Sequence, residues 1–131
     1  MIHRFSIDSL KQIFLTLPVP ICLLDRNTRY LAANKKYAEL CNTTLDKLAG
    51  RSMEDFCPSD LVAKARRDFE ILDDGGSIPD HEIIYKNRPL LVSVSPFDQG
   101  CKEAVSAIAV TLTDISKLKM EFTTVSDSLT A

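Results

Sequence analysis

The chain has 131 residues, which is enough for one hydrophobic core of ordinary size and too few for two. Hydrophobic residues make up 45% of the sequence and charged residues 26%, a balance that is typical of a folded domain and excludes a largely disordered chain. The formal net charge of -2 gives no electrostatic reason to expect nucleic acid or an anionic membrane as a partner.

The first predicted element is a short amphipathic helix that ends before Pro18. Ser6 can cap its start, and its apolar residues recur at helical spacing: Ile7, Leu10, Ile13, Phe14 and Leu17. The residues before it contain no apolar signal core, and the longest apolar run, 13–24, is interrupted by Pro18 and Pro20. We therefore expect a cytoplasmic domain with no direct membrane contact.

A hairpin and an asparagine-capped helix are expected next. Two strand-like runs, Pro20–Asp25 and Thr28–Ala33, are separated by a polar turn. Asn34 has the chemistry of a helix N-cap, and a helix over 35–41 follows it. Asn42 suits the left-handed conformation that often ends a helix.

Two further helices are predicted before the second half of the sheet. A short one covers 45–48 and stops before Gly50. A longer one begins at Ser59 or Asp60 and ends near Asp73, and its apolar positions recur at steps of four and three: Leu61, Ala65, Phe69 and Leu72. The glycines that follow it end the helix.

The rest of the chain is typical of an antiparallel meander. Strands are predicted over 80–86, 90–97 and 104–113, with turns at 87–89 and 98–100. Two strands, a group of helices and three strands make an α+β fold, in which helices pack on one face of a five-stranded antiparallel sheet.

Cysteine spacing argues against a metal centre. No Cys-x-x-Cys motif occurs, and neither histidine is near any of the four cysteines Cys22, Cys41, Cys57 and Cys101. We therefore expect no structural zinc and free thiols, as in a reducing cytosol.

Several local sequences resemble the PAS family of sensory domains. The segment 23–40 is similar to the family's opening hairpin and the asparagine-capped helix after it. Leu48-Ala-Gly-Arg51 resembles the Leu-x-Gly-Arg step before the next helix, and Leu91-Val-Ser-Val-Ser-Pro96 resembles the fourth strand. Thr113-Asp-Ile-Ser116 is similar to the Asp-Ile-Thr signature that closes the last strand. Together these motifs imply a PAS domain at 18–114, preceded by the helix within 1–17 and followed by a linker helix within 115–131.

The resemblance also bears on cofactors. Light-sensing flavin members of the family carry a reactive cysteine in a Gly-Arg-Asn-Cys motif, and Met53 stands at that position here. A thioether forms no thiol adduct with flavin, and Cys57 is one helical turn further on, where a packing role is expected. Haem-binding members place a histidine on the long helix, and 61–70 contains none. Flavin and haem are thus disfavoured, and we expect no cofactor, although an unidentified small molecule remains possible.

No residue is assigned a catalytic or metal-binding role. His81 has Asp80 and Glu82 beside it, but adjacent strand residues point to opposite faces of a sheet. A lone histidine is a weak metal signal, so surface charge explains this group adequately.

The PAS fold has a cavity between sheet and helices, and the resemblance implies that its walls are mostly apolar here. Its expected neighbourhood is Tyr37, Phe56, Leu61, Arg66, Phe69, Ile83, Tyr85, Val92, Val94, Ile108 and Val110. Tyr37, Tyr85 or Arg66 could orient a small metabolite. The alternative is a filled core, and the sequence leaves both interpretations open.

The end of the chain carries a heptad pattern. Its apolar residues are spaced three, four, three and four apart: Ile115, Leu118, Phe122, Val125 and Leu129. Two heptads do not hold together alone, so this helix needs to pair with a second copy or with the amino-terminal helix; a tail folded on its own sheet is the alternative. We expect a parallel homodimer, because the resemblance implies coupling helices of this kind. Asp114, Ile115 and Ser116 are the expected signal relay, with the Asp114 carboxylate capping the first turn of the helix.

The last residues give a hypothesis for the output domain. Asp127-Ser-Leu-Thr-Ala131 resembles the Asp-x-Leu-Thr-Gly start of a bacterial GGDEF diguanylate cyclase domain, which makes cyclic di-GMP. A competing resemblance, to sensor histidine kinases, rests on Lys119-Met-Glu-Phe122 and Val125-Ser126, but Asp127 stands where the phosphorylated histidine would be. The leading hypothesis is a regulatory ligand-binding and dimerisation module, the second is a ligand-free structural dimeriser, and the third is a small enzyme.

Overall fold

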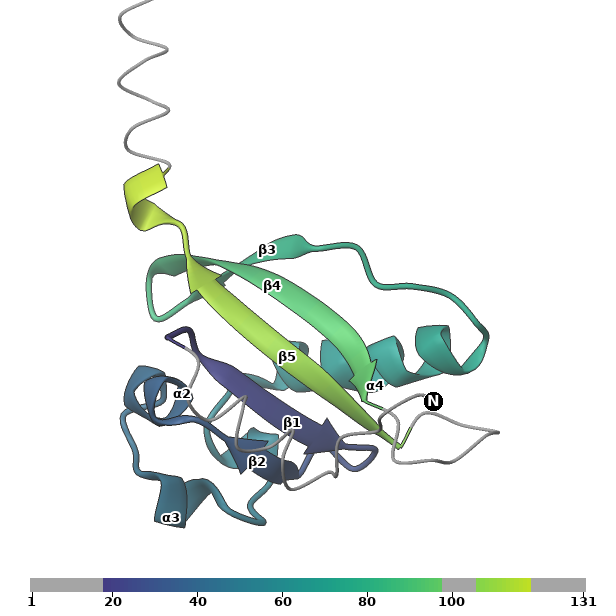
Figure 1. The fold of residues 1–131 in the computed structure, drawn as a ribbon, viewed down its shortest axis with the longest axis horizontal. Coiled ribbons are helices and arrows are strands. Elements are labelled where there is room, and N and C mark those ends of the chain that lie inside the picture. The colour runs from purple at the N-terminus through teal and green to yellow at the C-terminus, as the bar shows by residue number, and fades with distance from the viewer. Residues whose placement is uncertain (1–17, 98–105, 119–131) are drawn as a thin grey trace, which may run out of the picture.

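The structure is a computed structural model that describes residues 18–97 and 106–118. Five strands form one antiparallel sheet in the order β2-β1-β5-β4-β3, with β5 at its centre (Figure 1). The elements are β1 (Ile21–Asp25), β2 (Tyr30–Ala33), α2 (Lys35–Leu40), α3 (Leu45–Leu48), the 3-10 helix η1 (Met53–Asp55), α4 (Ser59–Asp73), β3 (His81–Tyr85), β4 (Arg88–Phe97) and β5 (Ala107–Asp114). The predicted α+β fold is confirmed.

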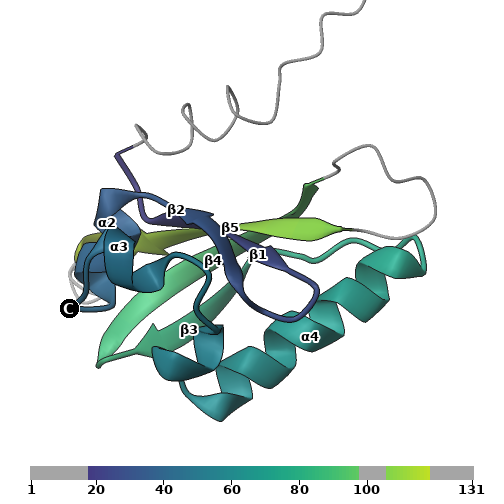
Figure 2. The same cartoon turned by 90° about the horizontal axis from the view of Figure 1, so that it is seen from below.

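The helices lie on one side of the sheet, where α4 runs along it (Figure 2). One core cluster joins buried residues of α2, α3 and α4 to residues of all five strands, because the apolar stripe of each helix and one face of the sheet exclude water together. Successive strand residues point to opposite faces, so Leu23, Ala107 and Ala109 form a separate small cluster on the other face.

The turn between β1 and β2 is built by the carboxylate of Asp25. Its Oδ1 accepts hydrogen bonds from the backbone N–H groups of Asn27 and Arg29 at 2.8 and 2.9 Å. Thr28 has a φ of 59° and is fully buried, and its hydroxyl donates to the carbonyl of Asn27 at 2.6 Å. The polar turn expected at this position is therefore confirmed.

An ion pair ties this turn to the end of α4. The Arg26 guanidinium donates to both carboxylate oxygens of Asp73, at 3.0 and 2.6 Å, and lies 5.3 Å above the ring of Phe69. Such an exposed pair contributes little to stability, but its two-point geometry fixes the turn against the helix.

The turn between β3 and β4 lies earlier than expected. The sequence predicted a turn at 87–89, whereas Lys86 and Asn87 form it, with φ values of 51° and 63°. Two successive residues with positive φ are the requirement of a two-residue hairpin turn, and Asn is one of the few residues that adopt this conformation readily. Arg88 and Pro89 already belong to β4.

Pro89 is accommodated at the start of β4 because of where the pairing with β5 begins. Pro89 pairs with Ile84 of β3, but pairing with β5 starts only at Leu90, so the missing N–H breaks no bond to β5. The Pro89 carbonyl instead accepts a hydrogen bond from the Ile115 N–H at 3.0 Å. The remaining predicted elements, the helix at 7–17, the turn at 98–100, residues 104–105 of the last strand and the helix beyond 118, lie outside the described residues.

Candidate ligand-binding site

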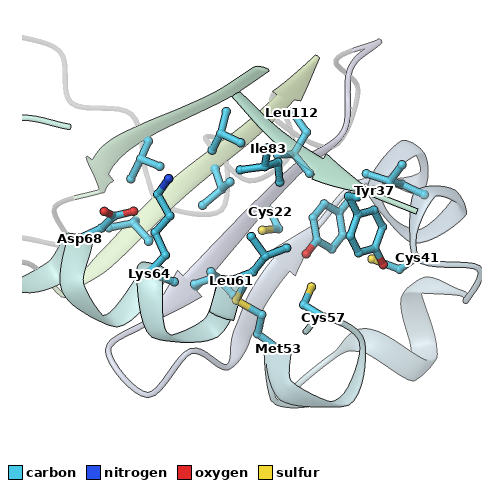
Figure 3. A pocket seen from close by; sticks show the side chains of 18 of the residues that line it. Cys22, Tyr37, Cys41, Met53, Cys57, Leu61, Lys64, Asp68, Ile83 and Leu112 are labelled. Atoms are coloured by element: carbon cyan, nitrogen blue, oxygen red, sulfur yellow. The ribbon is translucent and has the colours of Figure 1, made fainter. Parts of the chain in front are cut away.

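A cavity of about 60 Å³ lies between the helices and the sheet (Figure 3). Eight of the residues expected around it line it: Tyr37, Leu61, Ile83, Tyr85, Val92, Val94, Ile108 and Val110. The strand members alternate along β3, β4 and β5, so their side chains share the sheet face that the helices cover. Cys22 and Leu24 of β1 and Leu112 of β5 complete the apolar floor.

Three residues expected at the cavity lie elsewhere. Arg66 is exposed on α4, where its guanidinium donates to the Glu54 carboxylate at 2.5 Å. Phe69 is buried under Arg26. Phe56 packs edge-on against the Tyr30 ring at a centroid distance of 6.0 Å.

Asn34 determines where Tyr37 stands. Its Oδ1 accepts hydrogen bonds from the N–H groups of Tyr37 and Ile21 at 2.9 and 3.1 Å, and its Nδ2 donates to the Val19 carbonyl at 2.5 Å. The side chain is fully buried and joins the start of α2 to the start of β1. The predicted N-cap is confirmed, and so is the left-handed exit at Asn42, whose φ is 57°.

At one end of the cavity, here called the tyrosine end, the polar groups of Tyr30, Tyr37 and Tyr85 are paired within the protein. The hydroxyls of Tyr30 and Tyr37 lie 2.8 Å apart, and the Tyr85 hydroxyl donates to the Phe56 carbonyl at 3.1 Å. Burial raises the pKa of all three tyrosines, so they stay neutral at physiological pH. These hydroxyls hold the wall of the cavity together.

Three thiols, which the sequence analysis did not place at the cavity, line it: Cys41 and Cys57 at the tyrosine end and Cys22 on the floor between the two ends (Figure 3). Burial raises the pKa of the Cys22 thiol, which therefore behaves as a small apolar group. Interaction with the Cys57 thiol lowers the pKa of the Cys41 thiol to about 7, and the same interaction raises the pKa of Cys57. Cys57 is half-buried and therefore partly accessible to solvent.

The opposite end, here called the carboxylate end, is formed by Lys64 and Asp68 of α4 with His81 of β3. Asp68 is 6% exposed, and burial raises the pKa of its carboxyl, an effect that the nearby charges of His81 and Lys64 oppose. Nδ1 of His81 donates to the Pro79 carbonyl at 3.0 Å, since a carbonyl can only accept. Sequence analysis treated His81 as a surface charge and missed Lys64 and Asp68.

A signal for Asp68 was present in the sequence. At 3.6 residues per turn, Asp68 lies about 40° from Leu72 around α4, whereas Arg66 lies about 120° from it. Asp68 therefore belongs to the apolar stripe that includes Leu61 and Ala65, and an acidic residue in such a stripe is unusual.

The last strand leads from the cavity to the expected signal relay. β5 ends at Asp114, whose Oδ1 accepts a hydrogen bond from the Ser116 N–H at 2.9 Å. The Ser116 hydroxyl, and after it this N–H, lower the pKa of the Asp114 carboxyl. Residues 116–118 are helical. Ile115 is half-buried and Leu118 is 64% exposed, while Phe122, Val125 and Leu129 lie outside the described residues.

A family model described as the PAS fold matches residues 14–117. The chain belongs to the PAS-fold family. It is therefore a sensory and regulatory module, and the resemblance stated from its motifs is confirmed at this level. No curated protein sequence matches the chain.

Solved structures from several sources are similar in fold to this domain. The phage VqmA–DPO complex has a TM-score of 0.68 at 19% identity over 94% of this chain, which spans 59% of that one. The Rhodobacter sphaeroides LOV protein has a TM-score of 0.61 at 17% identity, covering 82% of this chain and 66% of that one. The PAS domain in complex with ethanol of a LuxR-family regulator from Burkholderia thailandensis has a TM-score of 0.58 at 20% identity, covering 81% and 96%. At these identities the likeness shows the fold alone.

Two further features of this PAS domain bear on its chemistry. Within 18–97 and 106–118, no three His, Cys, Asp or Glu side chains gather closely enough to hold a metal ion. None of the helices in the described part combines the length and the apolar character that a membrane span needs.

Proposed function

We propose that this PAS domain binds a small ligand in its cavity and relays occupancy through β5 to the helix that follows. The observation that carries the proposal is the position of β5. Ile108, Val110 and Leu112 of this strand line the cavity, and its last residue, Asp114, holds the first turn of the following helix. A ligand that displaces β5 therefore displaces the origin of that helix.

The ligand of this proposal is small and is not a flavin or a haem. A water-sized molecule needs roughly 10–15 Å³ of such space, so a cavity of about 60 Å³ admits a few non-hydrogen atoms and no large ring system. Met53 lines the cavity and supplies no thiol. The Burkholderia domain in complex with ethanol is a precedent for a ligand of this size in the same fold. Purified protein should be colourless, and an absorption band near 450 nm or a Soret band that survives gel filtration would contradict this.

The proposal includes a homodimer formed through the helix after β5. Leu118 is 64% exposed at the start of this helix, and Ile115 is half-buried three residues earlier. The heptad spacing continues from these two residues to Leu129, and an apolar seam of that kind gains stability by pairing with a second copy. The free thiols Cys22, Cys41 and Cys57 fit a role in the reducing cytosol.

The output domain of the proposal is a diguanylate cyclase, because residues 127–131 resemble the start of a GGDEF domain. A cyclase must bring two GTP molecules together from two subunits, and a paired helix can set that approach. The sequence encoded after Ala131 tests this directly. A continuation of the Leu-x-Asn-Arg type supports the cyclase, whereas a His-Glu-Leu-Arg segment would assign the domain to a histidine kinase.

The relay is tested by hydrogen exchange on the 131-residue protein. Asp114→Ala removes the acceptor of the Ser116 N–H, so we expect faster amide exchange at 115–118 with an unchanged melting temperature. Native mass spectrometry of the same protein, compared with denaturing mass spectrometry, reports a retained ligand as extra mass. If the melting temperature of Asp114→Ala falls by tens of degrees, Asp114 is a core residue and the relay is refuted. If mass spectrometry finds no retained ligand under any condition, the structural dimeriser is favoured.

A further inference from the structure

Asp68 is the most unusual side chain at the cavity. It lies on the face of α4 that packs against the sheet, among the buried residues Val62, Ala65 and Phe69, and it is 6% exposed. A carboxylate at such a depth normally has an ion-pair or hydrogen-bond partner, because removal of a charge from water without one costs several kcal/mol.

No such partner exists within the described segments 18–97 and 106–118. No hydrogen-bond donor or salt-bridge partner reaches the Asp68 carboxylate; Lys64 and His81 act on it only as nearby charges. Its oxygens are not sealed in the core either, since every fully enclosed side-chain oxygen or nitrogen in this part of the protein has a partner. Asp68 lines the cavity, and Figure 3 shows its carboxylate on the side of α4 that faces the sheet.

The charges around Asp68 determine what can bind there. Lys64, one helical turn before it, lines the same end of the cavity and carries a positive charge close to the carboxylate. An anionic ligand is repelled by Asp68 and a cationic ligand by Lys64. A hydroxyl group is neutral, donates one hydrogen bond and accepts others, so it can donate to the carboxylate and accept from the ammonium group at once.

We propose that the carboxylate end binds the hydroxyl of a short, uncharged alcohol, whose alkyl part lies among Leu61, Ile83, Val94 and Ile108. Asp68 accepts the hydroxyl proton in a hydrogen bond and Lys64 donates to the hydroxyl oxygen. The cavity volume of about 60 Å³ has room for roughly four to six non-hydrogen atoms. This assignment rests on the proposed ligand-sensing function and gives it a ligand class.

The test is a methyl NMR titration of the 131-residue protein with 1-butanol and with diethyl ether. The two molecules are isomers, but only the alcohol can donate a hydrogen bond. We expect both to shift the methyl signals of Ile83, Val94 and Ile108, and the alcohol to bind about tenfold more tightly, as is typical of one hydrogen bond to a charged group. Butylammonium and butyrate should bind more weakly than 1-butanol.

Variants separate the role of Asp68 from the existence of the site. Asp68→Leu should bind the two isomers equally, whereas Glu70→Leu, at an exposed position of the same helix, should keep the tenfold preference. Lys64→Met should reduce the affinity for both isomers, because both have an oxygen that accepts from the ammonium group. This variant provides a second test of the site if Asp68→Leu does not fold.

Each outcome has a distinct meaning. If no probe shifts the cavity methyl signals, the proposed ligand-sensing function fails together with this assignment. If the isomers bind equally to the natural protein, or if Asp68→Leu keeps the preference, the sensing function stands and the role of Asp68 is refuted. Tighter binding of butylammonium or butyrate would refute the uncharged ligand class.

Discussion

The two ends of the cavity treat buried polar groups in opposite ways. At the tyrosine end every hydroxyl has a partner within the protein, at 2.8 Å between Tyr30 and Tyr37 and at 3.1 Å from Tyr85 to the Phe56 carbonyl. At the carboxylate end the Asp68 residue is 6% exposed, but its oxygens are not enclosed by protein and have no hydrogen-bond partner in the described part of the chain. Paired groups stabilise the fold, and a buried group left unpaired is a candidate for recognition. Substitutions should therefore have opposite effects at the two ends.

The largest effect is expected for Asn34→Ala, which removes the side chain that positions Tyr37. The helix cap is lost, and the Ile21 N–H and the Val19 carbonyl are left without their partner. We expect the free energy of unfolding to fall by about 2–4 kcal/mol in urea denaturation. Lys36→Ala, at an exposed position of the same helix, is the control and should change it by less than about 0.5 kcal/mol.

Tyr37→Phe should have the next largest effect. It leaves the buried Tyr30 hydroxyl without its strongest partner and should reduce the free energy of unfolding by about 1–2 kcal/mol. The double variant with Tyr30→Phe removes both hydroxyls, so its loss should be smaller than the sum of the two single losses. Strict additivity in this double-mutant cycle would mean that the two hydroxyls do not stabilise each other, and the contrast between the ends would weaken.

Asp68→Leu should act in the opposite direction and should depend on pH. Burial raises the pKa of the Asp68 carboxyl in the folded protein above its ordinary value of 3.8, so the folded state holds its proton more tightly than the unfolded state. This carboxyl therefore makes the natural protein less stable as the pH rises from about 3.8 through the folded-state pKa. We expect Asp68→Leu to be the more stable protein at pH 7 and to lose this advantage at acid pH. Urea denaturation at several pH values measures the difference, and a variant that is less stable at pH 7 would show that Asp68 supports the fold.

The smallest expected effect is on reactivity and not on stability. Because the Cys57 thiol lowers the pKa of Cys41 to about 7, the alkylation rate of Cys41 by iodoacetamide should rise only about twofold from pH 7 to pH 9. A thiol with the ordinary pKa of 9.0 would gain about fiftyfold over the same range. Peptide mass spectrometry follows the rate at Cys41 itself. Cys57→Ala should restore the steep profile, whereas Cys57→Ser keeps a donor and should stay close to the natural protein.

The sequence was sufficient for the fold because the fold depends on patterns that repeat along the chain. Several residues support each of these predictions: the apolar spacing of α4, the Asn34 cap and the alternation of buried and exposed residues in the strands. The β3–β4 turn was misplaced because Pro89 was taken as a turn residue, while the pairing of β4 with β5 begins after it. β4 thus tolerates Pro89 at a position that needs no N–H for the pairing with β5.

The site was predicted less completely, because apolar walls follow from periodicity and polar contacts do not. Tyr37, Ile83 and Val94 lie where the alternation placed them. Two residues expected at the cavity make other contacts instead: Phe69 packs under the Arg26 guanidinium, and Arg66 forms an ion pair with Glu54. Both contacts join different segments of the chain. The thiols of Cys41 and Cys57 come together from two such segments, and spacing along the chain carries no trace of that proximity.

The central place of β5 has a consequence for how such a sensor can diversify. Under the proposed relay, a substitution at Ile108, Val110 or Leu112 would alter both ligand binding and the origin of the helix that follows, so each would have two phenotypes. Lys64 and Asp68 are on α4, which is far in the sequence from β5 and its last residue, Asp114. Substitutions in α4 and β3 should therefore change the ligand preference and leave the response to binding intact. A mutational library selected for altered ligand preference should recover changes in these two elements before changes in β5.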